Sequence, residues 1–105
     1  MNVQTLAELL QDEKQQTFLL DVRTPREREV ALLEPSLFIP LQELHLRFRE
    51  LAPYKEKRMV VYCHHGIRSD YATHFLKDAG FDDVHNLEGG IDAWSLEIDP
   101  NVQRY

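Results

Sequence analysis

Residues 59–69 read MVVYCHHGIRS, and this stretch decides the fold because it joins a strand pattern to a chemically reactive loop. Its first four residues are apolar and include two valines, the composition of a strand that is buried on both faces of a sheet. The run stops at His64 and His65, and Ser69 then offers a hydroxyl as a helix N-cap. We therefore expect a buried strand ending at Cys63, a short loop, and a helix that begins at Ser69.

Short apolar runs alternate with helical patterns over the rest of the chain. Besides the strand at 59–63, this pattern predicts strands at 18–22, 37–39 and 84–87. Helices are predicted at 5–11, where Thr5 and Glu8 have capping-box spacing, at 25–30, at 41–51 before Pro53, from Ser69 to Gly80, and at 91–96. The alternation predicts an α/β domain with a mainly parallel central sheet and helices on both faces.

The composition bounds the class of protein. The 105 residues contain no internal repeat, linker or low-complexity tract, so we expect one domain over residues 1–105. The single Cys excludes an internal disulfide and fits a reducing cytoplasm. The first residues lack a signal-peptide pattern, and no apolar run reaches the roughly eighteen residues of a membrane span. A net charge of −6 argues against a nucleic-acid partner, whose phosphates need clustered Lys and Arg.

The charge is unevenly distributed along the chain. Residues 58–77 carry three basic residues and one acidic residue, whereas residues 78–105 carry one basic and seven acidic residues. The cationic window also contains the only Cys and three of the five His residues. A locally positive segment in an acidic chain indicates a site for a small anion.

Cys63 is predicted to lie at the carboxyl edge of the sheet, where open α/β folds place their sites. The start of the next helix presents unpaired N–H groups and a positive dipole end, which stabilise an anion on the sulfur. A lone Cys at the end of a strand is often only a small buried hydrophobe. Two neighbours favour a nucleophilic Cys63 instead: Gly66 gives the turn backbone freedom, and Arg68 supplies a permanent cation. His64 and His65 fit equally a substrate contact or an exposed loop without a chemical task.

The Cys63-His64-His65 cluster raises the question of a metal. Adjacent residues on a tight loop rarely converge on one ion, and the chain has neither a second Cys nor a spaced His pair on one helical face. We therefore expect no metal. Gly89-Gly90 lacks the third glycine of a dinucleotide fingerprint, and no Gly-rich loop ends in Lys-Ser, so no cofactor is expected.

Three stretches of the chain resemble signatures of the rhodanese family, whose single-domain members are sulfurtransferases. They are Leu20-Asp21-Val22-Arg23 with Glu27 and Phe38-Ile39-Pro40; Val60 to Ser69; and Gly89-Gly90-Ile91-Asp92-Ala93-Trp94. Together they span nearly the whole chain in the right order. The resemblance implies the rhodanese-like three-layer domain and a sulfur atom carried as a persulfide on one essential Cys.

Carried over position by position, the resemblance makes Cys63 the sulfur acceptor. It implies that the persulfide is stabilised by the backbone N–H groups of the loop residues His64, His65, Gly66, Ile67 and Arg68. Arg68 would hold a small anionic donor such as thiosulfate, and Ser69 would bond near the sulfur or cap the helix. Asp21 and Arg23 would brace the loop from the neighbouring strand end.

The acceptor that the resemblance implies is cyanide in an assay and a thiol or sulfur-carrier protein in a cell. Two other readings remain open: a rhodanese-like module that binds a partner or senses redox state without catalysis, and a Cys-dependent phosphatase or arsenate reductase. Four residues separate Cys63 from Arg68, one fewer than in the related phosphatases. The resemblance therefore implies sulfur transfer rather than phosphoryl transfer.

Overall fold

Four short parallel strands form the centre of the computed structural model, which describes residues 1–105. The strands are β1 (Thr17–Asp21), β2 (Leu37–Phe38), β3 (Arg58–Tyr62) and β4 (Val84–Asn86), in the order β2-β1-β3-β4. The last residue of β1, Asp21, pairs with the last residue of β3, Tyr62. The chain passes from β1 to β2 on one side of it and then crosses to β3 on the other side. Open parallel sheets bind ligands at such a change of direction, which here lies at the carboxyl ends of β1 and β3.

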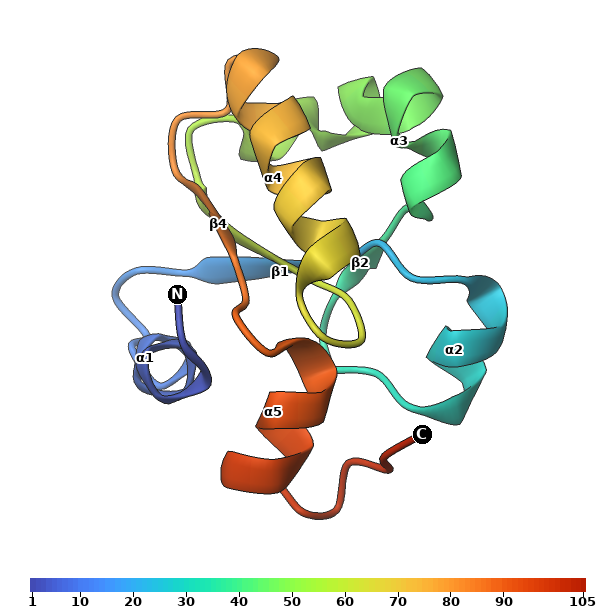
Figure 1. Cartoon of the computed structure of the whole chain (residues 1–105). Coiled ribbons are helices and arrows are strands. Elements are labelled where there is room, and N and C mark those ends of the chain that lie inside the picture. The colour runs from blue at the N-terminus through green and yellow to red at the C-terminus, as the bar shows by residue number, and fades with distance from the viewer.

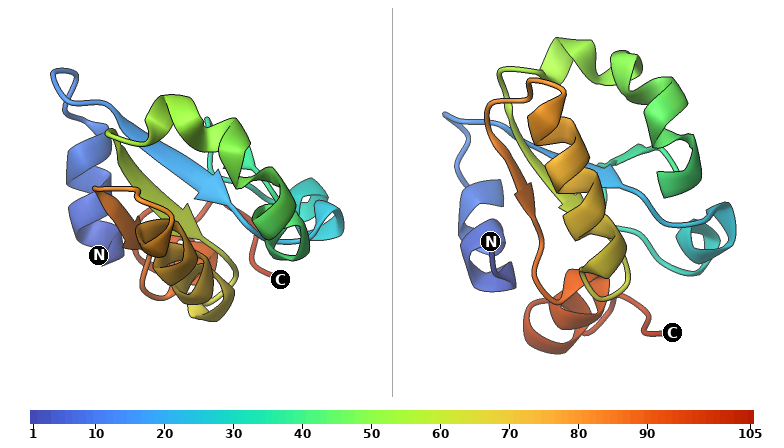
Figure 2. Two further views of the ribbon diagram at one scale, coloured as in Figure 1. Left: turned by 90° about the horizontal axis from the view of Figure 1, so that it is seen from above. Right: turned by 45° about the horizontal axis from the view of Figure 1, so that its top comes forward.

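Helices cover both faces of this sheet. They are α1 (Val3–Leu10), α2 (Pro25–Val30), α3 (Leu41–Arg47), the 3-10 helix η1 (Phe48–Tyr54), α4 (Ile67–Asp78) and α5 (Gly90–Glu97). The longest, α4, lies along β3 and β4 (Figure 2). None of the helices combines the length and apolar character needed to cross a membrane. After α5 the chain turns back and ends near α2 (Figure 1).

The side chains of β3 alternate between two hydrophobic cores, one on each face of the sheet. Met59 and Val61 pack in a core shared with α3, η1 and α4, whereas Val60 and Tyr62 pack in a core shared with α1 and α5. All four side chains are completely buried, and each buried Val or Met stabilises the fold by about 1.5–3 kcal/mol. The predicted α/β fold, with a parallel sheet and helices on both faces, is confirmed.

The predicted start of the first helix is wrong. The helix α1 begins at Val3 because Asn2 is its N-cap, and the Asn2 side chain accepts a hydrogen bond of 2.8 Å from the Thr5 amide. Thr5 is therefore inside the helix, and the predicted capping box of Thr5 and Glu8 does not form. The cap that does form satisfies one of the N–H groups left free in the first turn.

The helix after the loop begins at Ile67, two residues earlier than predicted. Its N-cap is Gly66 with φ 102°, a left-handed conformation that residues with a Cβ rarely adopt. Ser69 lies completely buried in the first turn of α4, and its hydroxyl is 3.3 Å from the Cys63 sulfur. The hydroxyl therefore serves the loop and does not cap the helix.

The helix predicted at 41–51 is divided in two. The α-helix α3 ends at Arg47, and the chain continues as η1 through Pro53, which was expected to end the helix. A proline has no N–H group, and this loss matters less in a short 3-10 segment, whose hydrogen bonds are already poor. The predicted apolar stripe still faces the core, because Leu44 and Leu51 are each only 2% exposed.

Candidate active site at the loop after β3

Cys63 follows β3 directly and lies at the bottom of the loop that leads into α4. Its side chain is buried, and its Sγ accepts hydrogen bonds from the amides of Gly66 at 3.1 Å and Ser69 at 3.4 Å. The Ser69 hydroxyl lies 3.3 Å from the same sulfur. The two amides thus converge on Sγ at the start of a helix, an arrangement that stabilises negative charge on the sulfur.

The loop carbonyls point away from the sulfur toward α5 and β4. The amide of Ile91 donates to the Cys63 carbonyl at 2.9 Å, and the amide of Asp92 donates to the His64 carbonyl at 3.1 Å. These donors belong to the first turn of α5, whose amides have no partners within the helix. Because the carbonyls are held on this side, the loop amides face the side on which the sulfur lies.

Gly90 is required for this contact between α5 and the loop. Its φ is +61°, and a Cβ at this position would lie 2.4 Å from the His64 carbonyl oxygen and 2.5 Å from the Cys63 carbonyl oxygen. Both distances are well below van der Waals contact, and both involve backbone atoms that cannot rotate away. In the sequence, Gly90 was named only within the stretch from Gly89 to Trp94, and its support of the loop was not predicted.

Asn86, the last residue of β4, supports the loop from the next strand. Its side-chain amide donates to the Gly66 carbonyl at 3.1 Å, and its Oδ1 accepts a hydrogen bond of 2.5 Å from the Ser69 hydroxyl. A serine hydroxyl has one proton, so while Ser69 donates to Asn86 it can only accept at the sulfur. If the sulfur becomes an anion, rotation of the hydroxyl would supply it with a further donor.

Arg68 points back to α2, where it forms a bidentate ion pair with Glu27. The two guanidinium-to-carboxylate distances are 2.7 and 2.9 Å. The Arg68 guanidinium lowers the pKa of Glu27 to about 2, against the opposing effect of burial. Glu27 in turn raises the pKa of Arg68. The cation that the sequence placed beside the sulfur is therefore balanced by a carboxylate and held in one orientation.

Glu27 also fixes the start of α2. Its carboxylate accepts from the Thr24 amide and hydroxyl, and the Glu27 amide donates to the Thr24 hydroxyl, which completes a capping box. This box was not recognised in the sequence, although Thr24 and Glu27 have the required spacing. The capping box limits the freedom of the carboxylate that holds Arg68.

Asp21 and Arg23 form a completely buried ion pair at the end of β1. Arg23 donates to both carboxylate oxygens of Asp21, at 2.8 and 2.7 Å. Burial opposes the charge on Arg23, but the hydrogen bonds that Arg23 donates to Asp21 and Tyr105 outweigh burial and raise the pKa of Arg23. Arg23 also donates to the carbonyls of Glu27 and Ala31 at the two ends of α2. The pair therefore braces α2, and Arg23 also reaches the loop through Tyr105, whose ring stacks on His64.

The two loop histidines lie in a stack of three aromatic rings. The His64 ring is 3.9 Å from the His65 ring on one side and 3.9 Å from the Tyr105 ring on the other. Burial, followed by the charge of His65, lowers the pKa of His64, so His64 is neutral at neutral pH. His65 is exposed, with its Nε2 3.7 Å from Asp92. The stack lies at the rim of the loop, away from the hydrogen bonds to Sγ.

His64, His65 and Asp92 are also the one group of ligand-type residues near the loop. One ligand atom of each lies within 4.8 Å of the others. The His64 and His65 rings are tilted by 30° with their centroids 3.9 Å apart. Asp92 is held by Arg104 at 2.8 Å. The carboxylate of this group is therefore already balanced by a cation.

Ile67 contributes only its backbone to the site. Its side chain is 82% exposed and points into solvent. The amides of His65, Ile67 and Arg68 donate to no protein carbonyl, because they belong to the loop or to the first turn of α4. These three amides remain available to an atom bound above Sγ.

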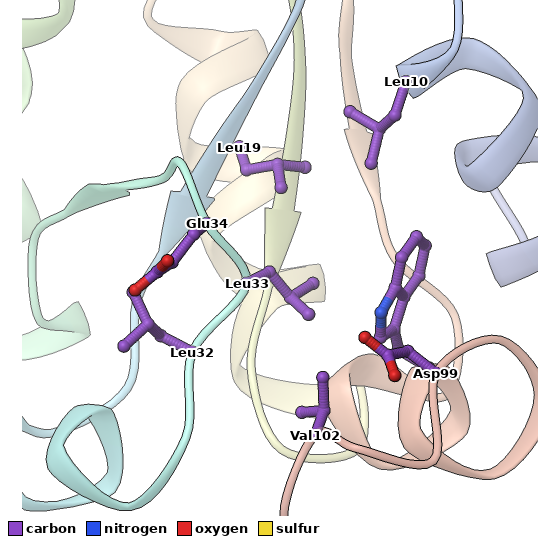
Figure 3. Close-up of a pocket in the computed structure, with 8 residues that line it drawn as sticks. Leu10, Leu19, Leu32, Leu33, Glu34, Asp99 and Val102 are labelled. Carbon is purple, nitrogen blue, oxygen red and sulfur yellow. The ribbon is translucent and has the colours of Figure 1, made fainter.

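An apolar hollow of about 270 Å³ lies apart from the loop, on the face covered by α1 and α5 (Figure 3). It is lined by Leu10, Leu19, Leu32, Leu33, Trp94 and Val102 together with Glu34 and Asp99. None of residues 63–69 lines it. The hollow therefore supplies no group to the site around Cys63.

Comparisons with known proteins agree with this geometry. The family model for the Rhodanese-like domain matches residues 2–97. "Thiosulfate sulfurtransferase GlpE" of Vibrio cholerae is 32% identical over 78% of this chain and 76% of its own length. "Adenylyltransferase and sulfurtransferase MOCS3" of Arabidopsis thaliana is 35% identical over 93% of this chain, which spans only 24% of that relative. A rhodanese-related protein of Thermoplasma volcanium superposes with a TM-score of 0.83 at 33% identity, covering 100% of this chain and 97% of its own.

Proposed function

The chain belongs to the family of rhodanese-like domains, and we propose that it is a sulfurtransferase that carries a sulfane sulfur on Cys63. The observation that carries this proposal is the convergence of the Gly66 and Ser69 amides on the Cys63 sulfur at 3.1 and 3.4 Å. A nucleophile surrounded by fixed N–H donors suits a reaction in which negative charge moves from one sulfur atom to the next.

The first half-reaction loads the sulfur. The thiolate of Cys63 attacks the outer sulfur of thiosulfate, a bond forms between the two sulfur atoms, and the sulfur–sulfur bond of thiosulfate breaks. Sulfite leaves with the electron pair of that bond, and the enzyme keeps a persulfide with a negative outer sulfur. The amides of His65, Ile67 and Arg68 donate to no protein carbonyl, and they are the groups that we propose to hold this outer atom. They replace the water that would otherwise solvate its charge.

The second half-reaction unloads the sulfur. A nucleophile attacks the outer sulfur of the persulfide, the sulfur–sulfur bond breaks, and Cys63 leaves as a thiolate stabilised by the Gly66 and Ser69 amides. With cyanide the product is thiocyanate. In the cell we propose a thiol or a sulfur-carrier protein as the acceptor. The two half-reactions predict ping-pong kinetics.

Arg68 is the group that we propose to hold an anionic donor. Two of its N–H groups are engaged by Glu27, and a guanidinium has five, so others remain for a donor oxygen. The printed name of the Vibrio cholerae relative supports thiosulfate as the donor. The name of the Arabidopsis thaliana relative supports sulfur transfer as part of a larger protein.

The mass of the intact chain tests this function. Incubation with thiosulfate should add the mass of one sulfur atom, and cyanide should remove it with release of one equivalent of thiocyanate. Cys63→Ser should gain no sulfur, with its urea midpoint showing that it is folded. An absence of added sulfur on the wild-type chain, or equal turnover by Cys63→Ser, would refute the proposal. Hydrolysis of an aryl phosphate that depends on Cys63 would point to phosphatase chemistry instead.

A further inference from the structure

Tyr105 is held against the active-site loop by its own ring and by the residue before it. Its ring stacks on His64 with an interplanar angle of 11° and a centroid distance of 3.9 Å. The residue before it, Arg104, forms an ion pair of 2.8 Å with Asp92 in the first turn of α5. These contacts seat the last residues of the chain beside α2 and the loop (Figure 1).

The hydroxyl of Tyr105 lies between a cation and an anion. It donates to Glu27 Oε2 at 2.7 Å and accepts from Arg23 Nη1 at 3.0 Å. Burial, partly opposed by Arg23 and aided by Glu27, raises the pKa of Tyr105 to about 12. The hydroxyl therefore keeps its proton at neutral pH, and the direction of both hydrogen bonds is fixed.

The same Glu27 oxygen also accepts from Arg68 Nη2 at 2.9 Å. Two guanidinium groups, those of Arg23 and Arg68, thus approach Glu27 from different elements, and the Tyr105 hydroxyl bridges Arg23 to the Glu27 carboxylate. Without the hydroxyl, Arg23 Nη1 keeps only its 3.4 Å hydrogen bond to the Glu27 carbonyl, and the N–H group that it gave to Tyr105 is free to pair with the carboxylate of the same residue. A carboxylate shared between two guanidinium groups would hold Arg68 less firmly than one reserved for it.

We propose that Tyr105 is a positioning residue for the sulfur donor: its hydroxyl reserves Glu27 for Arg68, and so fixes the guanidinium that receives an anionic donor. The inference rests on the proposed function of Arg68 and extends it to a residue that lies 37 positions further along the chain. The stacking of the Tyr105 ring on His64 positions the Tyr105 hydroxyl, and this hydroxyl affects Arg68 through its hydrogen bond to Glu27.

The test separates binding from sulfur transfer by measuring thiosulfate affinity in chains that also carry Cys63→Ser. Amide NMR titration with thiosulfate gives the dissociation constant for the otherwise unchanged chain, Tyr105→Phe and Tyr105→Ala. Tyr71→Phe is the matched control, because Tyr71 is 68% exposed on α4 and its hydroxyl makes no hydrogen bond. One lost hydrogen bond to a charged group predicts a dissociation constant about three- to tenfold higher for Tyr105→Phe.

Two further readouts distinguish positioning from a general loss of structure. The ring protons of His64 should keep their stacking shifts in Tyr105→Phe and lose them in Tyr105→Ala. In chains with Cys63 intact, Tyr105→Phe should raise KM for thiosulfate, whereas the rate at which cyanide discharges a preformed persulfide should not change.

The outcomes judge this inference and the proposed function separately. Equal thiosulfate affinity in Tyr105→Phe and Tyr71→Phe overturns the inference, even if Tyr105→Ala binds more weakly. The reason is that the proposed effect on Arg68 depends on the Tyr105 hydroxyl, which only the Phe substitution removes selectively. Absence of measurable thiosulfate binding to the Cys63→Ser chain overturns it as well. If binding depends on the Tyr105 hydroxyl but the wild-type chain gains no sulfur, the inference stands and the proposed function fails.

Discussion

Glu27→Gln tests the ion pair that holds Arg68. Gln keeps the shape of the side chain and one acceptor oxygen but removes the charge that pairs with Arg68 at 2.7 and 2.9 Å. We expect the variant to fold with a lower free energy of unfolding at neutral pH. The loss should depend on pH, because the protonated carboxyl of the wild-type chain resembles Gln.

The size of the loss follows from the pKa of Glu27, which falls from 4.5 to about 2 on folding. A difference of this size corresponds to about 3 kcal/mol in favour of the ionised form in the folded state. The Glu27 side chain is 18% exposed but Arg68 is 36% exposed, so solvent screening reduces the expected loss to about 2–3 kcal/mol. Because the folded pKa is the lower one, this stability is complete above pH 4.5 and is lost as the pH falls toward about 2.

Urea unfolding of both chains over this pH range measures the effect. The difference in unfolding free energy should be largest near neutral pH and should shrink toward zero near pH 2. Glu29→Gln is the control, because Glu29 lies on the same helix, is exposed and forms no ion pair. A difference for Glu27→Gln that stays constant with pH, or one no larger than that of Glu29→Gln, would refute the reasoning.

Two other substitutions test the supports of the site. Asp21→Asn should lower the free energy of unfolding by about 3–5 kcal/mol in urea titrations, because it leaves the buried Arg23 charge unpaired. Asp82→Asn is its control: Asp82 is exposed, and its substitution should change the free energy of unfolding by less than about 0.5 kcal/mol. Equal losses in the two variants would contradict the role of the buried pair. Gly90→Ala should slow sulfur loading from thiosulfate about ten- to a hundredfold, because its Cβ would displace the loop carbonyls. Gly80→Ala, also at positive φ but beside only the Lys55 side chain, is its control, and a wild-type loading rate in Gly90→Ala would contradict the steric account.

The strands, the loop and the order of the elements were predictable because each depends on residues close together in the sequence. The apolar run before Cys63 indicates a buried strand wherever it occurs, and the position of the loop at the carboxyl edge follows from parallel topology. The helix starts were harder to predict, because the Asn2 side chain caps α1 and the left-handed Gly66 begins α4, while Thr5 and Ser69 nearby are also residue types that cap helices.

The supports of the site were not predictable in the same way. These supports are hydrogen bonds between residues that are far apart in the sequence. The separations are 41 residues for Glu27 and Arg68, 78 for Glu27 and Tyr105, and 17 for Ser69 and Asn86. No periodicity links such positions, because their contacts depend on how separate elements pack. Asn86 offered one usable signal: it is a polar residue that ends a strand at the same edge of the sheet as Cys63.

The pairing of Arg68 changes how the cationic window around Cys63 is understood. The excess of basic residues in 58–77 suggested a free positive charge that attracts anions. Glu27 balances that charge, so net attraction is not what distinguishes the loop. The loop is distinguished instead by the fixed orientation of its hydrogen-bond donors. Contacts with α5 and Asn86 fix the loop amides, and the Arg68 guanidinium is held in one orientation. Fixed donors bind an anion without the entropy cost of ordering them. They also remain equally aligned as the charge moves from donor to persulfide, which a mobile cation would not.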